Sequence, residues 1–284
     1  MIEDIDSNAV GEYSGSDGMD SLHRLLLYML TELDRVSSKH GLRYFLAYGT
    51  LIGAVRERGI IGWDVDVDVF VPVDDYDSLC ARLSAELQQD LCLYSPASVP
   101  GYEYTFARIG FRGVDHKILH ADLNPLGSGP DRRFGRFAYA VLVKLVNEFY
   151  MLKLVSLEEK IHYGLLKRTI TRLAKIPLTF VPARALLSIM TSIRRKQFAG
   201  RTLADSCGFF GARQFFDPAW FENTTKVEFE GQLFNAPIGT EPLLEKMYGD
   251  FMSPASAKER ESQFERAQRY HVTPLRRLGL IANS

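Results

Sequence analysis

The chain contains YGTLIGAVR at residues 48–56 and, after one short loop, WDVDVDV at residues 63–69. In the second segment carboxylates alternate with valines, so in a β-strand Asp64, Asp66 and Asp68 would share one face and the valines the other. Three like charges on one face repel each other, and a cation readily neutralises such a row. Hard oxygen ligands of this kind select Mg²⁺ or Mn²⁺. We therefore predict a strand that presents carboxylates to a divalent metal, rather than a merely solvated strand face.

The first segment predicts a small-residue turn that leads into a short helix. Gly49 and Thr50 leave room for a ligand, and the N–H groups of the first turn of a helix bind phosphate. Arg56 follows on the helix, where its guanidinium would pair with phosphate as a bidentate donor or form a surface salt bridge. The stretch therefore places a phosphate-binding turn next to a metal-binding strand.

Hydrophobic periodicity places both segments in an α/β pattern. Leucines at helical spacing predict a helix over residues 21–40 that Gly41 ends. Asp122 falls at the end of a predicted strand, where a catalytic side chain can reach a cleft, and Arg108 and His120 lie close to it in the pattern. The other elements that we predict are strands over residues 42–47, 63–71, 102–110 and 117–123, a helix over residues 74–91, a loop over residues 127–136, a hairpin around residues 226–234 and helices over residues 243–247 and 259–269.

The composition indicates a globular protein. The chain has 284 residues, of which 46% are hydrophobic, so it can fold around one or two hydrophobic cores. Its three cysteines lack CxxC spacing and are odd in number, which argues against a zinc site and a disulfide framework. Residues 1–20 lack the basic and apolar regions of a signal peptide. We therefore expect a cytoplasmic protein with a flexible acidic lead-in over residues 1–20.

The net charge of −1 conceals a basic block over residues 131–213, which has 16 Lys or Arg residues against 5 Asp or Glu residues. Residues 137–193 are mainly helical by pattern, and charged or proline residues interrupt the apolar runs too often for a clean membrane span. The block fits three roles: a solvated helical face, buried core helices, or a peripheral contact with the inner face of a membrane. We expect no nucleic-acid partner.

Together these segments resemble the LicD family, which includes bacterial phosphocholine transferases and fukutin-type ribitol-phosphate transferases and belongs to the nucleotidyltransferase fold superfamily. The resemblance covers about residues 22–122 and 229–254. Two positions beside the site differ from the family's usual pattern, because Gly62 precedes Trp63 and Asn124 precedes Pro125. The elements that carry the resemblance are, in order, residues 48–56, 63–68, 122–125, 236–237 and 248–252.

The resemblance implies a nucleotidyltransferase-like mixed sheet flanked by helices over residues 21–136. A basic helical insertion over residues 137–213 and a C-terminal segment over residues 214–284, packing back on the core, would complete the chain. The implied activity is Mg²⁺- or Mn²⁺-dependent transfer of phosphocholine or another phosphoalcohol from a CDP-linked donor. The acceptor would be a hydroxyl of a cell-surface glycan, such as lipopolysaccharide or teichoic acid, or of its lipid-linked precursor.

The resemblance also implies a set of site residues. Asp66 and Asp68 match the family's metal-binding Asp-x-Asp. Asp122 matches a third carboxylate that would bind metal or take the proton from the acceptor hydroxyl, unless it only caps the turn before Pro125. Gly49 and Thr50 correspond to a turn whose N–H groups and hydroxyl contact donor phosphate. The remaining predicted contacts are Arg56 for the donor phosphate and Trp63, Asp64, Arg108 and His120 in supporting positions.

Two other functions fit the same sequence. One is a nucleotidyltransferase that adds NMP from an NTP to a small molecule or a protein. The other is a non-catalytic membrane-surface or glycan-binding module that uses the basic block.

Overall fold

The computed structural model describes residues 18–154, 178–207 and 211–282. Most of the expected lead-in, and the part of the basic block between residues 155 and 177, lie outside these ranges. In the described residues a mixed sheet is flanked by helices, which confirms the predicted α/β class.

The chain divides into two compact units that interleave along the sequence. Unit 1 contains the described residues up to Leu93, together with Arg108–Leu123 and Ala219–Ser284. Unit 2 contains Tyr94–Ala107 and Asn124–Pro218. All ten predicted site residues therefore belong to unit 1, and most of the basic block belongs to unit 2.

The sheet of unit 1 is built around β2 (Asp66–Pro72), the strand that carries two of the alternating carboxylates. On one side β1 (Phe45–Leu46) pairs antiparallel with β2. On the other side lies β5 (His120–Gly129), followed in order by β4 (Ala107–Phe111) and β3 (Leu91–Tyr94). Asp122 is therefore on the strand next to the one that carries Asp66.

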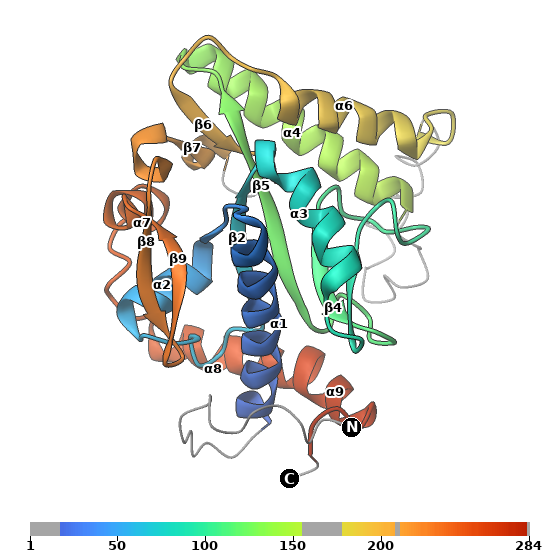
Figure 1. Ribbon diagram of the computed structural model, residues 1–284, viewed down its shortest axis with the longest axis vertical. Coiled ribbons are helices and arrows are strands. Elements are labelled where there is room, and N and C mark those ends of the chain that lie inside the picture. Colours follow the sequence, from blue (N-terminus) through green and yellow to red (C-terminus); the bar gives the residue numbers. More distant parts are fainter. Residues whose placement is uncertain (1–17, 155–177, 208–210, 283–284) are drawn as a thin grey trace. The chain divides into compact units, whose positions relative to one another are not determined.

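Two helices, α1 (Met19–His40) and α3 (Val73–Glu86), pack against each other and against β2 (Figure 1). Gly41, with a φ of 63°, ends α1 as predicted. Complete burial of each leucine on α1 contributes roughly 1.5–3 kcal/mol relative to exposure. The predicted apolar face of α1 is buried throughout, at Leu22, Leu25, Leu26, Met29, Leu30, Leu33 and Val36.

The C-terminal residues of unit 1 form the predicted hairpin and a set of short helices. Strands β8 (Thr224–Phe229) and β9 (Gln232–Pro237) pair antiparallel and pack beside β1 and α2 (Tyr48–Arg56) (Figure 1). The helical elements of this part are η2 (Pro218–Phe221), α7 (Thr240–Tyr248), α8 (Ala257–Ala267), η3 (Gln268–Val272) and α9 (Thr273–Arg277).

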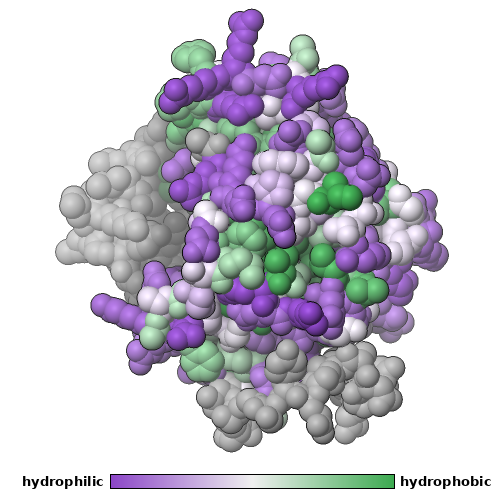
Figure 2. All heavy atoms as spheres, turned by 90° about the vertical axis from the view of Figure 1, so that its left-hand side faces the viewer, coloured by the Kyte–Doolittle hydropathy of each residue, from purple (hydrophilic) through white to green (hydrophobic). Residues whose placement is uncertain are grey.

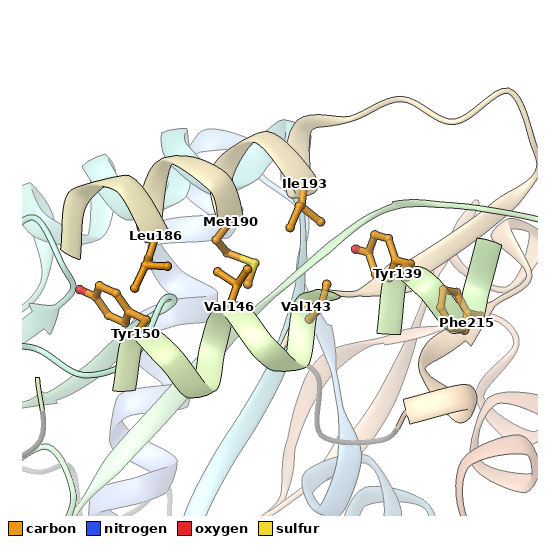
Figure 3. Close-up of a cluster of buried hydrophobic side chains, with 9 residues drawn as sticks. Tyr139, Val143, Val146, Tyr150, Leu186, Met190, Ile193 and Phe215 are labelled. Carbon is orange, nitrogen blue, oxygen red and sulfur yellow. The ribbon is translucent and has the colours of Figure 1, made fainter. Parts of the chain in front are cut away.

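Unit 2 places a helix pair beside a short antiparallel ladder. The second half of β5 pairs with β6 (Thr202–Asp205), and β6 pairs with β7 (Phe215–Phe216). Helices α4 (Arg133–Leu154) and α6 (Ala183–Arg195) share a hydrophobic core, and η1 (Gly211–Gln214) packs against α4. Figure 3 shows the side chains of this core pointing toward one another from the two helices. Within the described residues, no helix combines the length and apolar character needed to cross a bilayer.

Several predicted boundaries were wrong, each for a local reason. Strand β2 begins at Asp66 rather than at residue 63, because a turn closed by the Asp64 N–H and the Ile61 carbonyl, 2.7 Å apart, occupies the preceding residues. Helix α3 ends at Glu86 rather than at residue 91, and the strand that follows, β3, was not predicted. Residues 127–129 were predicted to be a loop but continue β5, because β6 provides them with a hydrogen-bonding partner.

Gly53 on α2 provides a test of packing in unit 1. A Cβ atom at this position would lie 2.4 Å from the backbone oxygen of Gly59, whereas a Cβ atom at Gly62 would meet no atom within 4 Å. We expect Gly53→Ala to lower the free energy of unfolding by about 1–2 kcal/mol, because the clash outweighs the roughly 1 kcal/mol gained in helix propensity. Urea denaturation measures the change. Gly62→Ala is the matched control, and equal midpoints for the two variants would contradict this packing.

Candidate functional site

Asp66 and Asp68 occupy alternate positions at the start of β2. Both are partly exposed, while the intervening Val67 and the following Val69 are completely buried. The valines anchor the strand in the core, and strand alternation then places both carboxylates on the opposite face. This part of the predicted geometry is present in the structure.

Asp64 lies before the strand, in the turn that leads into it. Its Oδ1 accepts a hydrogen bond from the Val65 N–H at 3.1 Å, and its carbonyl oxygen lies 3.0 Å from Nε2 of His23 on α1. A Cβ atom on Gly49 would lie 2.7 Å from Asp64 Oδ2. The absence of a side chain at Gly49 therefore allows this carboxyl group to approach the N-terminus of α2.

The pKa values of Asp64 and Asp66 are shifted in opposite directions. Burial raises the pKa of Asp64 well above its ordinary value, and the charge of Asp66 raises it further. Burial also acts to raise the pKa of Asp66, but the hydrogen bond and charge of His120, the charge of Arg108 and the hydrogen bond with Asp64 together lower it. In the absence of a cation, a proton on Asp64 therefore relieves the repulsion between these two groups.

Asp122 is buried and paired with Arg108. Asp122 Oδ1 lies 2.6 Å from Arg108 Nε, and Asp122 Oδ2 accepts a hydrogen bond from Arg108 Nη2 at 3.0 Å. His120 Nε2 lies 3.5 Å from Asp66 Oδ2 and 3.7 Å from Asp122 Oδ1. The structure thus brings together four predicted residues, Asp66, Arg108, His120 and Asp122. Nε2 of the His120 imidazole lies close to carboxylates on two adjacent strands.

The other predicted residues lie around this cluster or away from it. Thr50 is buried, and its hydroxyl oxygen accepts a hydrogen bond from the Asp68 N–H at 2.9 Å, so it ties α2 to β2. Trp63 is partly exposed in the turn before β2. Arg56 lies at the far end of α2, where it donates to Glu57 and to the carbonyl oxygen of Phe251. Contact of Arg56 with a donor phosphate remains a prediction.

Three residues from distant parts of the chain also surround the carboxylates, and the sequence did not identify them as site residues. Burial raises the pKa of Tyr248, and the charges of Asp68, Asp64 and Asp66 raise it further, so the Tyr248 phenol keeps its proton. His271 Nδ1 lies 2.6 Å from the carbonyl oxygen of Ile118. His23 is the third. Only Tyr248 carried a signal, because it lies in one of the segments that resemble the LicD family.

The arrangement fits a divalent cation in part. Asp66 and Asp68 offer oxygen ligands from one strand face, and Mg²⁺ is commonly held by one or two carboxylates together with substrate phosphates. Asp122, the predicted third ligand, directs both oxygens at Arg108. In the part of the chain that the structure describes, no three His, Cys, Asp or Glu side chains converge closely enough to hold a metal by themselves.

Because Arg108 and Asp122 form a buried ion pair, removing one partner should strongly lower the free energy of unfolding. Arg108→Met would leave the Asp122 charge buried without its guanidinium, so we expect the free energy of unfolding to fall by about 3–5 kcal/mol. The double variant Arg108→Met/Asp122→Leu removes both charges and should recover most of this loss. Chemical denaturation of these two variants and of the single variant Asp122→Leu measures the coupling. Additive losses would show that the pair does not act as a unit.

Two comparisons with known proteins find similarity to parts of this chain. Residues 41–125 match the family model described as "LicD/FKTN/FKRP, nucleotidyltransferase domain". All ten predicted site residues fall within this match, while Tyr248 and His271 fall outside it.

The lipopolysaccharide cholinephosphotransferase LicD of Haemophilus influenzae is 40% identical to this chain over 50 residues. These residues are 18% of this chain and 19% of the relative, so the similarity spans about a fifth of each protein. Residues 41–125 of this chain are therefore identified as a nucleotidyltransferase domain of the LicD family, as the sequence resemblance implied.

Proposed function

We propose that this chain is a metal-dependent phosphotransferase. It moves phosphocholine or another phosphoalcohol from a CDP-linked donor to a hydroxyl of a cell-surface glycan or of its lipid-linked precursor. The observation that carries the proposal is the position of Asp66 and Asp68, which are partly exposed on one face of β2 within the residues that match the LicD family, with the Asp68 N–H bonded to Thr50 in the first turn of α2.

The chemistry of such a transfer suits these residues. The acceptor oxygen forms a bond to the outer phosphorus of the donor, the bond from this phosphorus to the bridging oxygen breaks, and CMP leaves. The reaction depends mainly on positioning and on neutralising phosphate charge. Asp66 and Asp68 would hold Mg²⁺ or Mn²⁺, which when bound supplies positive charge at the diphosphate. The N–H groups at the start of α2 would face the same phosphates.

Asp122 has two roles in this proposal. One role is positional: Asp122 pairs with Arg108 and lies near the His120 imidazole, which in turn approaches Asp66. Asp122 is also our candidate for the acceptor of the hydroxyl proton, which requires the bound substrates to draw Arg108 away from at least one carboxylate oxygen. The Tyr248 phenol, which faces the carboxylates and remains protonated, would donate a hydrogen bond to a phosphate oxygen or to the acceptor.

Substitution of the two exposed carboxylates tests the site. Asp66→Ala and Asp68→Ala should each lower transfer from CDP-choline or CDP-ribitol by at least about 100-fold, because each removes a metal ligand. Asp74→Ala is the matched control, since Asp74 is an exposed aspartate on α3. Chelation should abolish the wild-type rate, and added Mg²⁺ or Mn²⁺ should restore it. Undiminished turnover in both variants would exclude this site.

Ligand-dependent melting separates the proposal from its main alternative, a nucleotidyltransferase that uses an NTP. A donor present at about 100 times its Kd stabilises the folded state by about 2.7 kcal/mol, which raises Tm. We expect CDP-choline or CDP-ribitol with Mg²⁺ to raise Tm more than CTP or ATP does at the same concentration. A shift with NTPs alone would favour the nucleotidyltransferase. No shift and no turnover with either class would favour a non-catalytic module.

A further inference from the structure

Helix α4 in unit 2 has two hydrophobic faces, and its partner helix covers only one of them. Tyr139, Val143, Val146 and Tyr150 are buried against α6, and Figure 3 shows them on the side of α4 that faces this helix. A step of two residues turns a helix by about 200°, so the residue two positions before Val143 points to the opposite side.

The opposite side of α4 carries a continuous run of exposed apolar residues, which we term the outer stripe. It begins at Phe134, which is 82% exposed, and Phe137, which is 67% exposed. Soluble helices normally present polar residues on the face away from the core, and a run of this kind marks an interaction surface. The outer stripe consists of Phe134, Phe137, Val141, Leu142, Leu145 and Phe149.

A groove between α4 and α6 adjoins this stripe. It has a volume of about 520 Å³, is open to solvent, and is lined in part by Ala138 and Leu142 of α4 and by Ile189 of α6. Lys196 lies at the same groove, with its ammonium 5.0 Å from the centre of the Phe198 ring. An apolar groove that contains a cation offers complementary contacts to an acyl chain and to the phosphate of the same lipid.

The charges around the stripe select the partner. Over residues 131–154 and 178–201 there are ten Lys or Arg residues against two Asp or Glu residues. Seven of the ten basic side chains are exposed, among them Arg132 and Arg133 at the start of α4 and Lys144 within it. Two copies of this surface would repel each other, whereas an anionic bilayer would attract it.

We propose that the outer stripe of α4 is a membrane-docking surface that lies in the interface of an anionic bilayer. The phenylalanines and leucines would enter the boundary between headgroups and acyl chains, while the flanking arginines and lysines would contact lipid phosphates. Within the basic block over residues 131–213, membrane contact is thereby assigned to one face of α4. This inference does not depend on the proposed transferase activity, because docking requires neither donor nor metal.

Vesicle co-sedimentation of the full chain tests the docking surface. We expect binding to vesicles that contain phosphatidylglycerol, weakening as ionic strength rises, and much weaker binding to vesicles of phosphatidylcholine alone. Phe137→Ser/Leu145→Ser should lower the partition coefficient by about tenfold or more, because it removes two inserted side chains. Arg132→Glu/Arg133→Glu should also lower it by about tenfold or more, and only on the anionic vesicles.

The matched control uses exposed apolar residues in another part of the chain. Figure 2 views the side on which β8 and β9 lie in Figure 1, and there hydrophobic residues form small groups among hydrophilic ones. Leu233 and Ile238, at the second strand of this hairpin and just after it, are 61% and 57% exposed. Leu233→Ser/Ile238→Ser should therefore bind vesicles as the wild type does.

Two outcomes would overturn the proposal. One is wild-type protein that does not bind the anionic vesicles. The other is stripe and control variants that bind equally well while circular dichroism shows both to be folded. Sedimentation velocity identifies the competing occupant: if the wild type is a dimer that Phe137→Ser/Leu145→Ser dissociates, and vesicle binding is absent, the outer stripe joins two copies of this chain instead.

Discussion

Repulsion between the carboxylates at the start of β2 is the constraint on which the site of unit 1 depends. Asp66 and Asp68 must share a face, since a strand alternates and Val67 between them is buried. The protein relieves the resulting charge in several ways. The pKa of Asp64 is raised by burial and by the charge of Asp66, His120 approaches Asp66 from the neighbouring strand, and Arg108 neutralises Asp122. In the reaction that we propose, a bound cation would take over part of this neutralisation.

This constraint explains why residues from distant parts of the chain meet at one place. Helix α1 contributes His23, α7 contributes Tyr248 and η3 contributes His271, each near the carboxylates or near the backbone beside them. All three residues lie outside residues 41–125, the segment that matches the LicD family. The family segment therefore supplies the acidic row, while the rest of the unit supplies protonated and neutral groups that surround it.

The sequence predicted long periodic elements well and short ones poorly. Helix α1, its glycine cap and the β8–β9 hairpin follow the predictions closely, because each carries a strong local pattern. Strands β6 and β7 have four and two residues, too few to establish a period; β6 forms because β5 offers a pairing edge, and β7 pairs with β6 in turn. The start of β2 was placed too early because the alternation of aspartate and valine begins inside a turn. The division into two interleaved units is likewise a property of packing, which no local pattern contains.

The sequence by itself determined which residues share a face: the carboxylates of β2 and the buried side of α1. These follow from the fixed periods of strands and helices, which act over neighbouring residues. Only the tertiary structure decided what each face meets. It paired Asp122 with Arg108, placed Tyr248 where the charges of the aspartates raise its pKa, and packed α6 on one side of α4, which leaves the outer stripe exposed. Such choices depend on contacts between segments far apart in the chain, and a local period carries no information about which segments will pack together.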